Sequence, residues 1–260
     1  QIGGVGIRLA HNALHDSPHQ SILLGGNDHV IEYNEVYRVG MDSDDCGAFY
    51  MGRNPSERGN VIRYNYWHDI GSSFAHGSCA VYFDDGTGGQ RVHGNVFYRA
   101  AGGNFGAVFL HGGHDNWVEN NIFIECKRAV GHAPWGDDYW NEWLTGDLWR
   151  ERLTQEVDIT SPLYLERYPE LKDFLSPTPK TRVNHLSRNI IVRCGDVMTG
   201  NWEASDNMVT EDDPGFADAA AGDFALREDS PVFDLIGNTG DRWDSIGLVV
   251  TPLRPVLPEK

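Results

Sequence analysis

The chain has 260 residues, a length that suits one large domain, and its 21 Lys and Arg against 38 Asp and Glu give a formal net charge of −17. Such an acidic chain lacks the basic face that a nucleic-acid partner requires. No apolar run approaches the roughly 20 residues of a membrane span, so neither nucleic acid nor a membrane is an expected partner.

One short phrase recurs along the chain: a run of apolar residues, then Asn, then an apolar or aromatic pair. Its asparagines are Asn12, Asn34, Asn65, Asn95, Asn121 and Asn189, and the first five lie 22 to 31 residues apart. A second phrase, a small residue followed by three apolar ones, stands between successive copies at 21–24, 48–51, 80–83 and 107–110. Self-similarity at this period is typical of repeat proteins, in which each coil packs on the next.

Each copy holds two short runs rich in β-branched and aromatic residues, which favours strands over helices. We therefore predict an all-β fold, a right-handed parallel β-helix that forms a single domain over residues 1–260. The recurrent Asn is expected to stack at a turn and to bond the local backbone. A small or apolar residue follows each Asn by five positions, which predicts an inward column that includes Cys126 and Cys194. Four cysteines in 260 residues do not indicate a disulfide framework.

Residues 132–184 interrupt the repeat with a partly helical, Trp-rich insertion. Its first half holds Trp135, Tyr139, Trp140, Trp143 and Trp149, and short helices are predicted over 147–156 and 161–171. Because the segment leaves after the second run of its coil, it should form a wall beside the ends of the earlier strands. A loop of this length with structure of its own is commonly functional. The alternative is an aromatic cluster that only covers the surface.

The two ends of the repeat differ. Residues 212–260 are predicted to form a terminal coil and a C-terminal cap, on the turn signals around Pro214 and Pro231. The N-terminal end has no such cap, and an open solenoid edge presents unpaired backbone groups. We expect this edge to be covered by preceding chain or by a second copy in a homo-oligomer.

Aligning the coils on the second phrase brings polar side chains into columns on one outer face. Because side chains alternate along a strand, Phe49 and Val81 should point inward, and Tyr50 and Tyr82 outward. The candidates for catalysis are the carboxylates Asp44, Asp45, Asp84 and Asp85. The candidates for substrate binding are Tyr50, Arg53, His76, Tyr82, His111, His114, Trp135 and Trp140.

Carboxylates in adjacent coils repel each other, which raises one pKa and leaves another low. An acid beside an ionised carboxylate is the pair that glycoside hydrolysis needs, and aromatic side chains suit sugar rings. Two simpler interpretations stay open: 84–86 is a turn, and 42–45 is a solvated loop or a Ca²⁺ site. A zinc site is not predicted, because no HExxH or CxxC spacing occurs. The chemistry requires no cofactor, and Ca²⁺ is the one ion considered.

Four phrases, at 28–34 (DHVIEYN), 44–50 (DDCGAFY), 58–65 (RGNVIRYN) and 82–86 (YFDDG), resemble the right-handed parallel β-helix carbohydrate-active proteins of the pectate-lyase-like superfamily. The chain is similar above all to the glycoside hydrolase family 141 type, which includes fucosidase and xylanase activities. The similarity extends over nearly the whole chain. It implies a sugar substrate and a pair of catalytic Asp residues, one in each Asp-Asp phrase. Members of this family are usually much longer than the present chain.

These interpretations predict a glycoside hydrolase that acts on a plant-type or other largely neutral polysaccharide or oligosaccharide. Asp45 and Asp85 are the expected pair, with Asp44 and Asp84 tuning or replacing them. One alternative is a polysaccharide lyase in which Arg53 or Ca²⁺ neutralises a uronate, although the net charge of −17 disfavours a polyanion. Another alternative is a non-catalytic glycan-binding solenoid. No N-terminal signal sequence is recognised, and a polysaccharide partner implies a secreted or periplasmic location.

Overall fold

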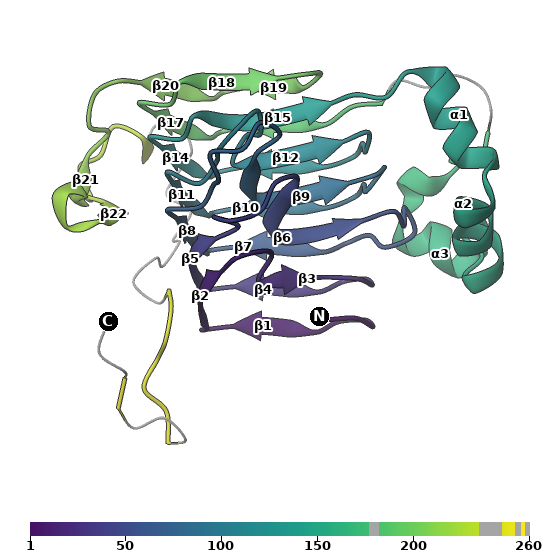
Figure 1. Cartoon of the computed structure of the whole chain (residues 1–260), viewed down its shortest axis with the longest axis horizontal. Helices are drawn as coiled ribbons and strands as arrows, with labels where there is room; N and C mark the ends of the chain where they lie inside the picture. Colours follow the sequence, from purple (N-terminus) through teal and green to yellow (C-terminus); the bar gives the residue numbers. More distant parts are fainter. Residues whose placement is uncertain (177–181, 234–245, 253–255, 258–260) are drawn as a thin grey trace.

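The computed structural model describes residues 1–176, 182–233, 246–252 and 256–257. The chain forms three parallel sheets whose strands stack in sequence order (Figure 1). This arrangement is consistent with a parallel β-helix in which each coil supplies one strand to each sheet.

The strands of the three sheets are short and follow one another around the coil. The first sheet contains β1 (Arg8–Ala10), β4 (Val30–Glu32), β7 (Val61–Arg63), β10 (Arg91–His93), β13 (Trp117–Glu119), β16 (His185–Ser187) and β19 (Glu203–Ser205). The second contains β2 (Ala13–Ser17), β5 (Glu35–Val39), β8 (Tyr66–His68), β11 (Val96–Tyr98), β14 (Ile122–Ile124), β17 (Ile190–Val192) and β20 (Met208–Thr210). The third contains β3 (Ile22–Leu23), β6 (Cys46–Gly52), β9 (Ser78–Asp84), β12 (Val108–His111), β15 (Arg128–Ala133) and β18 (Asp196–Thr199).

A coil thus has three strands, whereas the repeat predicts two runs, because the first run bends at its asparagine. The residue before the Asn has a positive φ, 54° at both Tyr33 and Tyr64, and this left-handed residue turns the chain from the first sheet into the second. The side-chain amide of the Asn then forms hydrogen bonds with backbone groups that have no partner within the sheets at this turn.

The predicted asparagine ladder is confirmed and runs from Asn12 to Asn207. At Asn95 the side-chain Oδ1 accepts hydrogen bonds from the backbone N–H and the side-chain amide of Asn65, each at 3.0 Å. The Asn95 amide in turn donates to the carbonyls of Ile62 and His93. Each Asn therefore joins one coil to the next at the same turn.

A second ladder, which the sequence repeat does not predict, stands at the turn from the third sheet to the first. The backbone N–H groups of Asn60, Gln90 and Asn116 donate to the side-chain oxygens of Gln90, Asn116 and Asn184, respectively, at 3.1–3.2 Å. Its residue types vary, and Gln90 replaces Asn in one coil, so no constant phrase marks it. This turn lies beside the insertion and bears one of the two pockets described below.

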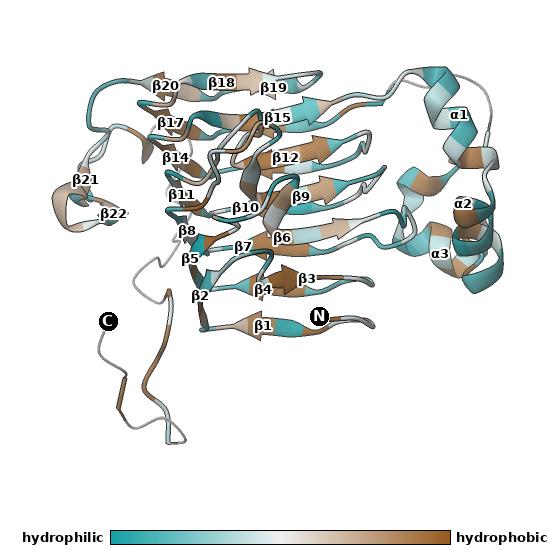
Figure 2. Cartoon of the chain, viewed as in Figure 1, coloured by the Kyte–Doolittle hydropathy of each residue, from teal (hydrophilic) through white to brown (hydrophobic). Residues whose placement is uncertain are grey.

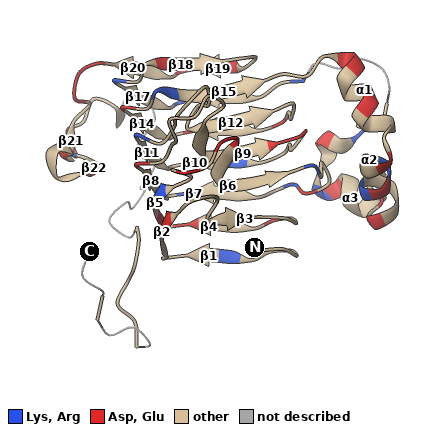
Figure 3. Cartoon of the chain, viewed as in Figure 1, with Lys and Arg blue, Asp and Glu red and all other residues tan. Residues whose placement is uncertain are grey.

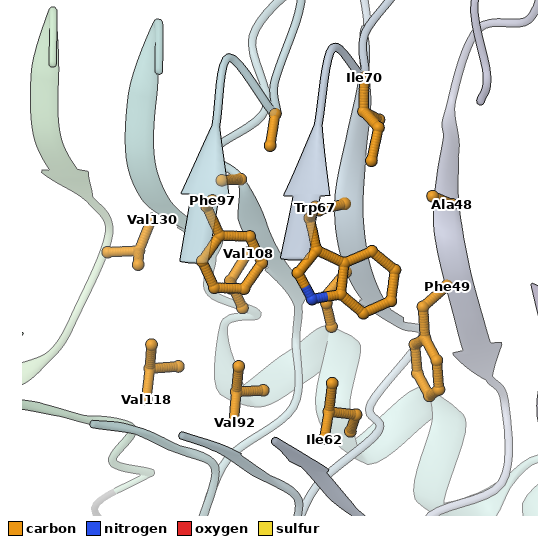
Figure 4. Close-up of a cluster of buried hydrophobic side chains, with 14 of the residues drawn as sticks. Ala48, Phe49, Ile62, Trp67, Ile70, Val92, Phe97, Val108, Val118 and Val130 are labelled. Carbon is orange, nitrogen blue, oxygen red and sulfur yellow. The ribbon is translucent and has the colours of Figure 1, made fainter. Parts of the chain in front are cut away.

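The core lies between the three sheets and is built from one layer of side chains per coil (Figure 4). In the second sheet the inward residues Trp67, Phe97 and Phe123 stack on one another, with ring centroids 6.3 and 4.8 Å apart. Figure 2 shows apolar residues along the strands and polar residues at many of the turns. The predicted inward positions are confirmed, including Phe49 and Val81, which are both 0% exposed.

The insertion leaves after β15 and forms three short α-helices at one side of the solenoid (Figure 1). They are α1 (Asp137–Thr145), α2 (Asp147–Glu151), which continues into a π-helical turn (Arg152–Glu156), and α3 (Pro162–Arg167), which is followed by a 3₁₀ turn (Pro169–Leu171). The helices expected over 147–156 and 161–171 are present. The helix α1 was not predicted, since its N-cap Gly136 supplies no side-chain hydrogen bond as a signal.

The C-terminal segment departs from the predicted terminal coil and cap over 212–260. Its strands β21 (Phe216–Asp218) and β22 (Asp223–Leu226) form an antiparallel hairpin that continues none of the three sheets. Phe216, Phe224 and Val232 cover outward-facing apolar residues of the second sheet, which are Val96, Ile122, Ile124, Ile190 and Val192. The hairpin therefore shields the side of the solenoid, because those side chains would otherwise face water. Residues 234–245, 253–255 and 258–260 of the predicted cap lie outside the described residues.

The four cysteines are free thiols. Cys46, Cys79 and Cys126 are buried, and Cys194 is half-buried above Cys126 in the predicted column. Burial raises the pKa of the Cys46 thiol to about 11. In the described part of the chain, no helix has the length and apolarity needed to cross a membrane.

Candidate active site

A polar pocket of about 430 Å³ extends along β6, from the turn that enters this strand to the residue that follows it, and reaches the end of β9. Its lining residues are His19, Gln20, Asp45, Cys46, Tyr50, Gly52, Arg53 and Asp84. The strands β6 and β9 run side by side in register, with Tyr50 opposite Tyr82 and Gly52 opposite Asp84. The Asp44-Asp45 phrase thus stands where this strand pair begins and the Asp84-Asp85 phrase where it ends, and Asp45 and Asp84 both line the pocket.

Asp84 is the centre of the hydrogen-bond network in the pocket. Its Oδ2 accepts a hydrogen bond of 2.6 Å from the Tyr50 hydroxyl, and its Oδ1 accepts one of 2.8 Å from the Asp85 backbone N–H. Burial alone would raise the pKa of Asp84, but the hydrogen bonds from His111, Tyr50 and the Asp85 backbone outweigh it and hold that pKa below the usual value. Asp84 is therefore an ionised carboxylate at neutral pH.

His111, at the end of β12, joins the two carboxylates of the Asp84-Asp85 phrase. Its Nδ1–H lies 3.0 Å from Asp84 Oδ1 and 3.1 Å from Asp85 Oδ1. These hydrogen bonds raise the pKa of His111 to about 9, so the ring is an imidazolium at neutral pH. The other oxygen of Asp85 accepts a 2.8 Å hydrogen bond from Arg53 Nε. Asp85 thus pairs with two cations and is 7% exposed, whereas Asp84 lines the pocket.

Asp45 faces the pocket from the turn that enters β6. Its Oδ1 accepts a 3.2 Å hydrogen bond from the hydroxyl of Tyr82, a ring that is buried between Cys79, Phe105 and Tyr50. The rings of Tyr50 and Tyr82 meet edge to face, with centroids 5.4 Å apart. Two tyrosine hydroxyls therefore position two carboxylates that line the same pocket, Tyr82 on Asp45 and Tyr50 on Asp84.

The insertion braces this site from one side. Trp135 packs edge to face on His111, with centroids 5.2 Å apart. The guanidinium of Arg152 donates to the backbone carbonyl of Arg53 at 2.6 Å. The insertion, predicted as a wall of the cleft, contacts His111 and Arg53, and no insertion residue is among those that line the pocket.

Four of the sequence-predicted site residues lie elsewhere. Asp44 caps the next coil, where its Oδ1 accepts a 2.6 Å hydrogen bond from the Gly77 backbone N–H, and His76 is exposed beside that contact. His114 packs against Trp140 and bonds the Asp115 carboxylate at 2.9 Å. Trp140 is only 3% exposed inside the aromatic core of the insertion. Trp140 therefore belongs to the buried cluster of the insertion and does not line the pocket.

Two pocket residues, His19 and Gln20, were not proposed from the sequence. They precede β3 and, in the register of β3 and β6, correspond to Cys46 and Gly47 of the next coil. Ile22 pairs with Phe49 in register, so the alignment of coils already contained this signal. Neither residue carries a carboxylate, so the search for paired acids does not select them.

Asp84, Asp85 and His111 also form the one group of three metal-binding side chains found in the described chain, with ligand atoms within 4.8 Å of one another. This donor set does not fit Ca²⁺, which takes six to eight oxygen ligands. The Nδ1–H of His111 already donates hydrogen bonds to both carboxylates, so this nitrogen holds a proton in the place where a metal ligand would need a free lone pair. The loop 42–45 fits no better, because Asp44 is used as a backbone cap.

Fold and site together define a class: a stacked parallel-sheet protein with a carboxylate-lined, tyrosine-buttressed pocket at its side. Comparisons with protein-family models, with curated proteins and with solved structures found no match to this chain. The geometry of the pocket is therefore the basis for assigning a function to this protein.

Proposed function

We propose that the protein is a glycoside hydrolase with a right-handed, pectate-lyase-like β-helix similar to glycoside hydrolase family 141. The observation that carries this proposal is the pairing of Asp45 and Asp84 in one pocket. Each of the two carboxylates is positioned by a tyrosine hydroxyl, and Asp84 is kept ionised by His111. Two carboxyl groups, one of them an anion, are what cleavage of a glycosidic bond uses.

In this proposal Asp84 is the anionic carboxylate that acts as nucleophile or base, and Asp45 donates the proton to the leaving oxygen. Asp85 is assigned a positioning role, because its carboxylate is paired with Arg53 and His111 and does not line the pocket. The proposed pair is thus Asp45 with Asp84, whereas the sequence favoured Asp45 with Asp85. Tyr50, half-buried at the pocket wall, offers a ring face to a sugar.

The charge of the chain supports a neutral substrate. The net charge is −17, and Figure 3 shows acidic residues on the solenoid turns and on the helices of the insertion. An acidic surface repels a polyanionic chain such as a uronate polymer. A neutral polysaccharide or oligosaccharide is therefore the proposed substrate, and it implies a secreted or periplasmic location.

One observation favours a second candidate, the polysaccharide lyase. The Arg53 side chain is 61% exposed at the rim of the pocket, where a guanidinium would bind a uronate carboxylate. Asp85 already balances that charge at 2.8 Å, which lowers its attraction for a second carboxylate. We therefore rank the lyase below the hydrolase.

The test is release of reducing sugar from xylan, galactomannan, mixed-linkage glucan and polygalacturonate. Asp45→Asn and Asp84→Asn should each lower the rate by at least a hundredfold, because a catalytic carboxylate is lost without a change in shape. Asp42→Asn, an exposed residue of the same loop, is the matched control and should leave the rate unchanged. Unfolding midpoints of all variants show whether a lost rate reflects lost folding.

Three results would contradict the proposal. Ultraviolet absorbance of an unsaturated product would establish elimination in place of hydrolysis. Full activity in Asp84→Asn would remove the central carboxylate from the chemistry. Binding without release of sugar in the wild-type chain would favour the non-catalytic glycan-binding solenoid.

A further inference from the structure

A second pocket, of about 510 Å³, lies where the strands of the first sheet begin. Its lining residues are Gly59, Asn60, Val61, Gly89, Gln90, Arg91, Asp115, Trp117, Glu170 and His185. No residue lines both this pocket and the Asp84 pocket. Its volume falls within the range of about 300–1,000 Å³ that is usual for small-molecule sites.

The most unusual side chain of this pocket is Trp117, which is 42% exposed on the outer face of β13. One face of the indole stacks on His185 of the next coil, with centroids 3.7 Å apart and planes 15° apart. The pocket extends to the opposite side, over the preceding coils, where Arg91 and Val61 line it. Because Arg91 pairs with Glu119, its guanidinium is engaged beside the indole. Trp117 is therefore held as a rigid platform that is open on the pocket side.

Two carboxylates complete the pocket, and one buried cation fixes both. The Arg58 side chain is 0% exposed, and it donates to Asp115 Oδ2 and to Glu170 Oε1, each at 2.9 Å. Burial alone would raise the pKa of Asp115, but hydrogen bonds and charge from His114 and Arg58 outweigh it and lower that pKa. Glu170 comes from the insertion and Asp115 from the coil, so the ion pairs also join the two parts of the molecule.

We propose that this pocket is a second, non-catalytic binding site for a neutral sugar unit, which stacks on Trp117 and donates hydroxyl hydrogens to Asp115 and Glu170. Three features support this ligand class. A flat indole with an open face suits the C–H face of a pyranose. Fixed carboxylates accept hydrogen bonds from hydroxyls at no further ordering cost. The cations Arg58 and Arg91 are already paired with acids, so the pocket offers little to an anion.

This inference rests on the proposed function for one point only, the choice of a neutral sugar as the class of ligand. An accessory site lined by the insertion residue Glu170 and separate from the Asp84 pocket would hold a polysaccharide chain without touching the scissile bond. Loss of the site should then weaken retention on polymers and leave cleavage of short oligosaccharides intact.

The experiment is affinity electrophoresis of the full chain through gels that contain xylan, galactomannan or mixed-linkage glucan. Trp117→Ala should lower the apparent affinity for the retaining polysaccharide at least tenfold, and Glu170→Gln severalfold. Tyr139→Ala removes an aromatic of matched exposure, 43%, from the insertion and should leave retention unchanged. Unfolding midpoints within a few degrees of the wild type confirm that the variants are folded.

The outcomes separate this inference from the hydrolase proposal. Trp117→Ala with unchanged retention, or a wild-type chain retained in none of the gels, overturns the second site. Weaker retention of Trp117→Ala together with an inactive wild-type chain supports the second site and refutes the hydrolase. Equal loss of retention in Asp84→Asn and Trp117→Ala would show that the two pockets act as a single binding site, and it would overturn the inference as well.

Discussion

His111 gives the sharpest test of the site, because its charge depends on the geometry proposed for the two carboxylates. Hydrogen bonds to Asp84 and Asp85 raise its pKa from the usual 6.5 to about 9. A shift of this size corresponds to about 3 kcal/mol of folding free energy at about 1.4 kcal/mol per pKa unit. The side chain is 33% exposed, so solvent screening reduces the expected contribution to roughly 1.5 kcal/mol.

The sign of the effect follows from proton linkage. A group whose folded-state pKa is raised binds its proton more tightly in the native state. The stabilisation by His111 should be fully present below pH 6.5 and should be lost as the pH rises through about 9. The wild-type free energy of unfolding should therefore fall by roughly 1.5 kcal/mol more across this window than that of His111→Asn.

Urea denaturation at several pH values between 6 and 10 measures this difference, and NMR titration of the His111 ring measures its pKa directly. Asp85→Asn leaves one charged acceptor in place, so the pKa of His111 in that variant should lie between 6.5 and 9. A ring pKa at or below 7 in the wild type, or equal pH dependence of wild type and His111→Asn, would refute the geometry described for the site.

Two further predictions concern the solenoid and the insertion. Asn95→Ala removes an acceptor that serves three buried donors. The Asn65 side-chain amide still donates to two carbonyls, but the Asn65 backbone N–H and the Trp67 indole lose this acceptor, so the substitution should cost about 2–6 kcal/mol in urea unfolding. Asn12→Ala, on the first and partly exposed rung, should cost clearly less, and equal losses would contradict the ladder argument. Gly86 has a φ of 81°, and a Cβ there would lie 2.4 Å from the buried Trp149 ring, so Gly86→Ala should cost about 2–4 kcal/mol and shift the tryptophan fluorescence. Gly136→Ala meets no atom within 4 Å and is the matched control; a silent Gly86→Ala would show that the insertion does not dock as described.

The sequence by itself determined the repeat, because each coil must bury the same face and turn at the same point. The ladder asparagines, the inward column through Cys126 and the outward placement of Tyr50 all follow from local turn chemistry and from alternation along a strand. These features depend on neighbours a few residues away and on the period of the repeat. The local neighbours and the period of the repeat are both visible in one amino-acid sequence.

Only the tertiary structure decided which side chains meet. Asp84 and Asp85 are adjacent in sequence and share His111, yet their other oxygens have different partners, Tyr50 for Asp84 and Arg53 for Asp85, and Asp85 has a φ of 38°. The pocket therefore pairs Asp45 with Asp84, a choice that depends on distances between coils. Trp140 likewise lies in the interior of the insertion because the helix α1 buries it, and no periodic phrase in the sequence marks that helix. The second ladder and the Trp117 pocket arise where different residue types occupy one turn of successive coils, so they become visible once the coils are stacked.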